Sequence, residues 1–176
     1  MRSLLRHLTA GTPLGFSLRL AVCWSPLIAF VVMRPLRAAV EEPLTRVYAV
    51  IASGTLNLLG AENTRQGAVL LSRSGDVAVE IAPVCTGYFL FWLYAGAVVA
   101  FPAPWTSRLK GIAGGAILIF TLNVVRILSL YYVLGAHPEL FDEIHLVVWQ
   151  SITVLAVSIA WYVWASRGPI AAPAAA

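Results

Sequence analysis

The sequence contains few charged residues and few cysteines. Only 11% of its 176 residues are charged, whereas 60% are hydrophobic. A soluble domain of this length needs more polar surface than that, so a soluble globular fold is excluded and lipid must cover much of the chain. Two cysteines are too few for a disulfide framework, and neither has zinc-ligand spacing around it. Any chemical role of a cysteine is therefore individual.

The net charge of +4 does not come from a cationic stripe, because the basic residues are scattered singly along the chain. This distribution argues against a nucleic-acid-binding surface and favours a role in membrane orientation. The sequence also has no nucleotide-binding motif, no internal repeat and no paired broken helices of the transporter kind. Nothing in it implies a metal or an organic cofactor.

Four apolar runs are each long enough to cross a hydrocarbon core of about 30 Å. They cover residues 18–33, 84–101, 112–134 and 146–165. We therefore predict an all-α integral membrane helical bundle of about four transmembrane helices, forming one domain over residues 1–168. The Ala/Pro-rich tail, residues 169–176, is predicted to be disordered. The basic start before the first run is also typical of a signal peptide, so cleavage of that run stays open.

Two further segments lie between the first and second runs. Residues 44–60 predict an interfacial helix, although a further crossing stays open. Its expected apolar stripe consists of Leu44, Val47, Ile51, Thr55 and Leu58. Residues 67–71 and 77–82 flank a turn-forming Ser-Arg-Ser-Gly-Asp sequence, which predicts a short extracytoplasmic β-hairpin.

The charges predict which side of the membrane each loop faces. With four crossings, one side carries basic residues and no acidic ones, namely Arg2, Arg6, Arg19, Arg108, Lys110 and Arg167. That side is predicted to be cytoplasmic. All 8 acidic residues fall on the other side, together with several arginines that weaken the rule.

Cys85 begins the second predicted crossing at its outer end. A helix N-terminus stabilises thiolate and lowers the pKa of a cysteine placed there, which favours a nucleophilic role. The alternative is a small apolar filler at the start of a helix, and the residue alone does not decide between them. Cys23, inside the first apolar run, is expected to be such a filler.

Arg126 is the single charge in the run 112–134, and an intramembrane arginine is costly unless something compensates it. Asn123 and Ser129 lie three residues before and after it, so one helix face carries all three polar groups. The functional interpretation is a cation that holds a developing oxyanion or a substrate carbonyl. Alternatively, Arg126 reaches out to the interface or joins helices through backbone carbonyls.

His145 begins the last crossing at the outer end, with Asp142 one helical turn before it. Such a histidine can act as general base and acid, and a carboxylate from Asp142 or Glu143 would orient its ring. A solvated helix cap is the alternative. Because Cys85, Arg126 and His145 come from three helices and are predicted near one membrane face, together they indicate acyl transfer through a thioester.

The sequence resembles the exosortase and archaeosortase family of membrane cysteine transpeptidases from about residue 42 to residue 164. The motifs that carry the resemblance match in order and spacing, and they are Cys85-Thr86-Gly87, Asn123-Val124-Val125-Arg126-Ile127 and His145. The segments 101–105 and 139–141, with the short length, are similar to the exosortase H subtype.

This resemblance implies an enzyme that cleaves the C-terminal sorting signal of exported proteins and transfers them to an acceptor. It implies Cys85 as nucleophile, Arg126 as stabiliser of the substrate or transition state and His145 as proton-transfer group. The supporting residues would be Asn123, Thr86 and Asp142. Thr86 stands where the family often has serine or asparagine, which leaves the thiol unaffected.

The subtype implies client proteins with an IPTLxxWG-like tail, cut on the periplasmic side of a bacterial inner membrane. Hydrolysis by a membrane protease would use the same residues, because the acceptor leaves no motif. The remaining alternative is a non-catalytic carrier or assembly subunit in which Arg126 binds an anion or a partner helix. The sequence leaves the oligomeric state open.

Overall fold

The computed structural model describes residues 13–167, with the backbone alone for 27–32 and 34–36. The helices are α2 (Pro13–Val32), α3 (Arg34–Leu58), α4 (Tyr88–Ala100), α5 (Trp105–Ala136), α6 (Phe141–Glu143) and α7 (Trp149–Arg167). The shorter turns are the 3₁₀ turns η1 (Pro83–Thr86) and η2 (Pro138–Leu140) and the π-helical turn η3 (Ile144–Val148). The strands are β1 (Asn63–Gln66), β2 (Val69–Ser72) and β3 (Ala78–Glu80). The predicted tail, 169–176, lies outside the described residues.

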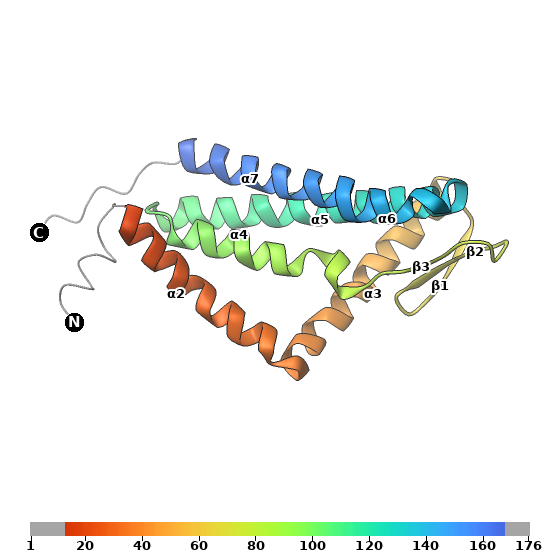
Figure 1. The fold of residues 1–176 in the computed structure, drawn as a ribbon, viewed down its shortest axis with the longest axis horizontal. Helices are drawn as coiled ribbons and strands as arrows, with labels where there is room; N and C mark the ends of the chain where they lie inside the picture. Colours follow the sequence, from red (N-terminus) through yellow and green to blue (C-terminus); the bar gives the residue numbers. More distant parts are fainter. Residues whose placement is uncertain (1–12, 168–176) are drawn as a thin grey trace, which may run out of the picture.

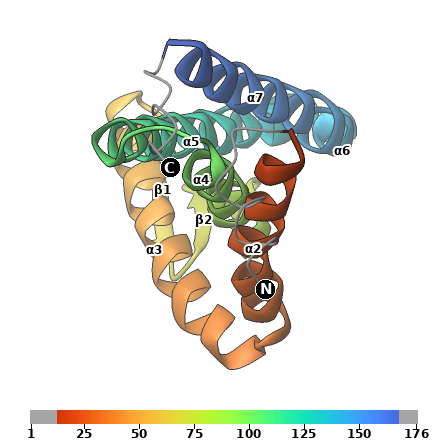
Figure 2. The ribbon, with the colours of Figure 1, turned by 90° about the vertical axis from the view of Figure 1, so that its left-hand side faces the viewer.

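Three helices run side by side along the length of the molecule (Figure 1). The longest, α5, lies between α4 and α7 and packs against both. Helix α2 packs on α4, and α2 and α3 meet in a V whose point lies away from the bundle (Figures 1 and 2). The sheet lies at one end of this bundle, beside α3. One end of α5 therefore lies next to the sheet, and the other end lies far from it.

Helix length decides how far the predicted membrane topology is supported. Within the described residues, two helical stretches are long and apolar enough to cross a membrane, Trp105–Ala136 and Pro138–Arg167. Helix α4 has 13 residues, so it is only about 20 Å long, short of a core of about 30 Å. The predicted run 84–101 is shortened because its first residues form η1. The chain is a helical membrane protein, and the count of four crossings stays a prediction.

The predicted helix over residues 44–60 is part of the longer α3, and its predicted apolar stripe lies beside the buried face of that helix. Leu58 is 90% exposed, whereas the buried face consists of Tyr48, Ala49, Ala52 and Leu56. This face combines the large side chains of Tyr48 and Leu56 with two small alanines, and it packs into the core cluster at the sheet. Because lipid also accepts leucine and valine, apolar character alone does not identify a buried face in a membrane protein.

The sheet has three antiparallel strands in the order β1-β2-β3. Strands β2 and β3 form the predicted hairpin, whereas β1 was not predicted because its sequence is polar throughout. Asn63 explains how a polar strand is held there. Its N–H donates to Asn57 Oδ1 at 2.9 Å, and its own Oδ1 accepts from the Ser53 hydroxyl at 2.7 Å. Side-chain hydrogen bonds from α3 thus replace apolar packing.

The apolar core has two parts, one at each end of α5. At the sheet end, Tyr48, Leu70 and Ile81 pack with Ile127 and with Cys85. At the far end, a smaller cluster contains Tyr94, Val98, Ile119 and Val157. The first cluster joins α3, the sheet and α5 around Cys85, so it fixes the region where the candidate residues lie.

Candidate active site

Cys85 lies in the 3₁₀ turn η1, between β3 and α4, rather than in the first turn of α4. The Thr86 hydroxyl closes this turn by donating to the Pro83 carbonyl at 2.7 Å. Gly87 follows with φ +68°, and a Cβ there would lie 2.4 Å from Asn123 Nδ2. Only glycine fits this left-handed position so close to α5. The turn therefore holds Cys85 at a fixed place against α5.

The structure brings Cys85 and His145 into contact although 60 residues separate them. Cys85 Sγ and His145 Nε2 are 3.5 Å apart, within hydrogen-bond distance for sulfur. Cys85 is 8% exposed and His145 is half-buried. A thiol whose proton points to an imidazole nitrogen is the starting arrangement for cysteine nucleophilic catalysis.

Burial raises the pKa of the Cys85 thiol, and the charge of Arg126 and a backbone hydrogen bond to Ala82 lower it by less. Cys85 precedes α4 and lies outside the membrane-spanning helices. The sequence predicted the opposite shift from a helix N-terminus, and that prediction is wrong because the thiol is buried within η1. The resting cysteine is therefore a neutral thiol, and its reactivity depends on a base such as His145.

Arg126 reaches the same place from α5 and is 7% exposed. Its Nη2 donates to the His145 carbonyl at 3.5 Å, a long and weak hydrogen bond. Among the described residues, its buried Nε has no hydrogen-bond partner. A buried N–H group without a partner is costly, so this N–H is available to a group that enters the site. The contact to a backbone carbonyl also matches the alternative of Arg126 as a link between helices.

These side chains line one small cavity of about 30 Å³. Its walls come from β3, η1, α5 and the segment before α7, and they include Glu80, Cys85, Arg126, Phe141 and His145. This volume is close to that of one water molecule, so a peptide must displace part of a wall in order to enter. The site is therefore too small for a peptide in this conformation.

His145 lies in η3, where the last helix makes a π-helical turn. Such turns are rare and frequently occur at functional sites, because the extra residue changes the direction of a side chain. Phe141 packs on the imidazole, with ring centroids 5.5 Å apart. The sequence analysis missed Phe141, although its position four residues before His145 on a helix is a usable signal.

The three predicted supporting residues have different places in the structure. Asn123 is buried, donates to the Ile119 carbonyl at 2.8 Å and packs on Gly87, so it positions η1. Thr86 is also buried and closes η1. Asp142 is exposed, and within residues 13–167 no hydrogen bond joins it to His145.

No group of three potential metal ligands occurs among the described His, Cys, Asp and Glu side chains.

The family model of transmembrane exosortases (Exosortase_EpsH) matches residues 9–148, most of the 176-residue chain. The chain belongs to the transmembrane exosortase family. The match contains Cys85, Arg126 and His145, and it agrees with the resemblance seen in the sequence. No curated protein and no solved structure matches the chain. Membership of this family supports a membrane transpeptidase-like role.

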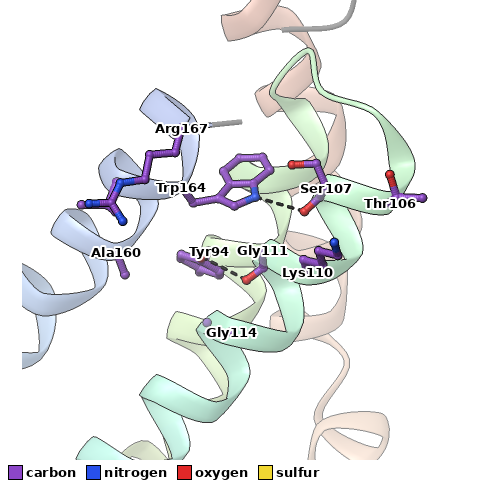
Figure 3. A pocket seen from close by; sticks show the side chains of 11 residues that line it. Tyr94, Thr106, Ser107, Lys110, Gly111, Gly114, Ala160, Trp164 and Arg167 are labelled. Atoms are coloured by element: carbon purple, nitrogen blue, oxygen red, sulfur yellow. Dashed lines mark hydrogen bonds between the residues drawn. The ribbon is translucent and has the colours of Figure 1, made fainter. Parts of the chain in front are cut away.

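The exosortase chain has a second and larger cavity of about 600 Å³ at the other end of α5 (Figure 3). Trp164 Nε1 donates to the Ser107 carbonyl at 3.0 Å, and the Tyr94 hydroxyl donates to the Gly111 carbonyl at 3.1 Å (Figure 3). Lys110 also lines this cavity. It contains none of the candidate catalytic side chains, so the larger of these two cavities is not the candidate active site.

Proposed function

We propose that this exosortase is a cysteine-dependent membrane transpeptidase that cleaves the C-terminal sorting signal of exported proteins and transfers them to an acceptor. The observation that carries the proposal is the 3.5 Å contact of Cys85 Sγ with His145 Nε2 in a cavity that Arg126 also lines. Family membership supports the transpeptidase-like role. The separation of acidic from purely basic loops supports a site that faces the periplasm of a bacterial inner membrane.

The first chemical step forms the acyl-enzyme. His145 Nε2 takes the thiol proton as Cys85 Sγ attacks the carbonyl carbon of the scissile peptide bond, so the C–S bond forms while the carbonyl oxygen becomes an oxyanion. Because the pKa of the thiol is raised by burial, proton transfer and attack are expected to be coupled. The unpartnered N–H of Arg126 would donate to the oxyanion.

The second step releases the tail, and the third regenerates the enzyme. The imidazolium of His145 donates its proton to the leaving amine nitrogen as the C–N bond breaks, which leaves a thioester on Cys85. His145 then takes a proton from the acceptor, whose attack on the thioester carbon breaks the C–S bond. The thiolate regains the proton from His145. An amine or glycan acceptor gives transpeptidation, whereas water gives the protease outcome.

The proposed clients are exported proteins whose C-terminus carries a short motif, a transmembrane helix and a basic cluster. For the short exosortase H subtype, the motif would be IPTLxxWG-like. The transmembrane helix would pack laterally on the bundle and bring the motif to the sheet end, where Cys85 lies. Because the cavity is too small for a peptide, client binding must also widen the path to the thiol.

One observation favours a second candidate function, a non-catalytic carrier or assembly subunit. Arg126 donates to the backbone carbonyl of His145, which is a structural link between α5 and the last helix. Its unpartnered N–H would then bind an anion or a partner helix. In that case Cys85 is incidental, and its replacement leaves client processing unchanged.

A tailed reporter protein in cells distinguishes these functions. The size of the reporter is compared for wild type, Cys85→Ala and the matched control Cys23→Ala at equal expression in the membrane. The proposal predicts an uncut reporter with Cys85→Ala and normal cleavage with Cys23→Ala. Normal cleavage with Cys85→Ala would remove the cysteine mechanism and leave the carrier.

A further inference from the structure

Strand β3 is an edge of the sheet and leads directly to the candidate nucleophile. It pairs with β2 on one side only. Val79 is buried, whereas Ala78 and Glu80 are exposed. Burial of one side chain fixes which face of the strand meets the core, so the register of the free edge is also fixed.

The hydrogen bonds of the hairpin show which backbone groups point away from β2. Val77 O accepts a hydrogen bond from β2 at 2.8 Å, and Ile81 N–H donates to the residue before β2 at 3.0 Å. Bonding direction alternates along an antiparallel strand, so the N–H and C=O of Ala78 and Glu80 point to the free edge. In the part of the chain that the structure describes, no backbone hydrogen bond satisfies these four groups.

The free edge of β3 adjoins the small cavity that contains Cys85. Val79, Glu80 and Ile81 line the same cavity as Cys85 and His145. The chain then passes from β3 through η1 into α4 (Figure 1). An extended peptide beside β3 would therefore end next to the thiol.

We propose that the free edge of β3 binds the client, whose extended segment before the scissile bond adds to the sheet as a fourth strand. This inference rests on the proposed function, since it names how the client reaches Cys85. Main-chain hydrogen bonds to Ala78 and Glu80 would hold the segment whatever its sequence. Entry of the segment would separate β3 from the Phe141 side of the cavity and open the path to the thiol.

The direction of the added strand follows from the order of segments in the client. The client passes from its motif into a transmembrane helix, just as this chain passes from β3 through η1 into α4. A client helix packed alongside the bundle thus brings in its motif with the same polarity as β3. The added strand is expected to be parallel to β3, with its scissile carbonyl at the level of Cys85.

Proline substitution tests the edge with a matched control on the opposite edge. Ala78→Pro removes an outward N–H that β2 does not use. Arg65→Pro makes the same change on β1, at an exposed residue. The Glu62 carbonyl accepts from Arg73 N–H, and bonding direction alternates along the strand, so the Arg65 N–H points away from β2. Ala78→Pro is expected to slow reporter cleavage by up to about tenfold, the loss of one hydrogen bond. Arg65→Pro is expected to cleave like wild type.

Crosslinking decides the question even if Ala78→Pro lowers the amount of folded protein. In a Cys23→Ser, Cys85→Ala background, single cysteines at Ala78, Glu80 or Arg65 are oxidised in membranes with a client that carries one cysteine before its cleavage motif. The inference predicts client disulfides at positions 78 and 80 and none at position 65. Equal crosslinking at all three positions would overturn it.

The same reporter separates this inference from the proposed function. If Cys85→Ala blocks cleavage while Ala78→Pro and Arg65→Pro both cleave normally, the edge proposal fails and the cysteine mechanism stands. If Cys85→Ala cleaves normally, the proposed function fails first. If Cys85→Ala and Ala78→Pro both lose reporter cleavage while Arg65→Pro cleaves normally, the result supports the proposed function and the edge proposal together.

Discussion

The two ends of α5 contain cavities of opposite character. The cavity at the sheet end holds about 30 Å³ and is lined by Cys85, Arg126 and His145. The cavity at the far end holds about 600 Å³, and Lys110 lies on its wall. A large cavity would ordinarily be the first candidate for a binding site. Here the small one has the reactive groups, which suits a site that excludes water until a client enters.

Removing the base should produce the largest difference between the two ends. His145→Ala is expected to slow cleavage of the tailed reporter by about 10²–10⁴-fold, because it removes the acceptor of the thiol proton. Tyr94→Phe at the far cavity removes only a hydroxyl that donates to the Gly111 carbonyl, and it should cleave like wild type. Equal losses in a time course of reporter cleavage would show that both variants act through stability alone.

Arg126 and Lys110 give the next largest contrast. Arg126→Ala should lower the cleavage rate by about 10²–10³-fold if its N–H groups hold the oxyanion. Lys110→Ala removes a cation from the far cavity and should change the rate by less than about twofold. The measurement is the initial rate at equal membrane expression. Were Arg126→Lys fully active, a point charge would suffice and donation by the guanidinium Nε would be unnecessary.

Gly87, at the sheet end, and Gly114, at the far cavity, differ in the space that an added Cβ would have. Gly87→Ala should lower both folded yield and cleavage, because its φ of +68° and the contact with Asn123 exclude a Cβ. The strain is expected to cost about 1–3 kcal/mol. Gly114→Ala lies at the far cavity, where nothing is within 4 Å of the added Cβ, and alanine favours the helix. Thermal unfolding in detergent checks both, and a Gly87→Ala protein as stable as wild type would contradict this packing.

The last contrast concerns the pH dependence of Cys85 reactivity. Burial raises the pKa of the Cys85 thiol above its usual range, so thiolate is the minor form at neutral pH. Alkylation of Cys85 in a Cys23→Ser background should therefore keep rising between pH 7 and about 9, by up to about tenfold per unit. A small permeant reagent and mass spectrometry give the rate. A plateau near pH 7 would mean that the thiolate is already stabilised.

The sequence was sufficient to predict which side chains meet at the sheet end. Arg126 stood out because a lone charge in an apolar run needs compensation, and Cys85 and His145 lay at the ends of neighbouring runs. The structure places Cys85 in contact with His145, and Arg126 in contact with the His145 carbonyl. Apolar runs also sufficed for a helical membrane protein, because their length and composition are a local property of the chain.

Features that depend on tertiary contacts were not predictable. Strand β1 is polar and is held by hydrogen bonds from α3, so it has no hydrophobic pattern. The buried face of α3 includes Tyr48 and Leu56, whereas Val47 and Leu58 on the neighbouring apolar stripe are exposed, and apolar character does not separate the two faces. The pKa direction of Cys85 depends on burial within η1, and the orientation of His145 depends on a π-helical turn. None of these features follows from a local hydrophobic pattern.

The most direct test of the central claim is to isolate the covalent intermediate. The purified protein is mixed with a tailed client, quenched in acid and digested, and mass spectrometry locates any bound client fragment. The account predicts a hydroxylamine-sensitive thioester on Cys85 that carries the N-terminal part of the client, and none in Cys85→Ala. Client cleavage with no adduct on Cys85, or an adduct on another residue, would contradict it.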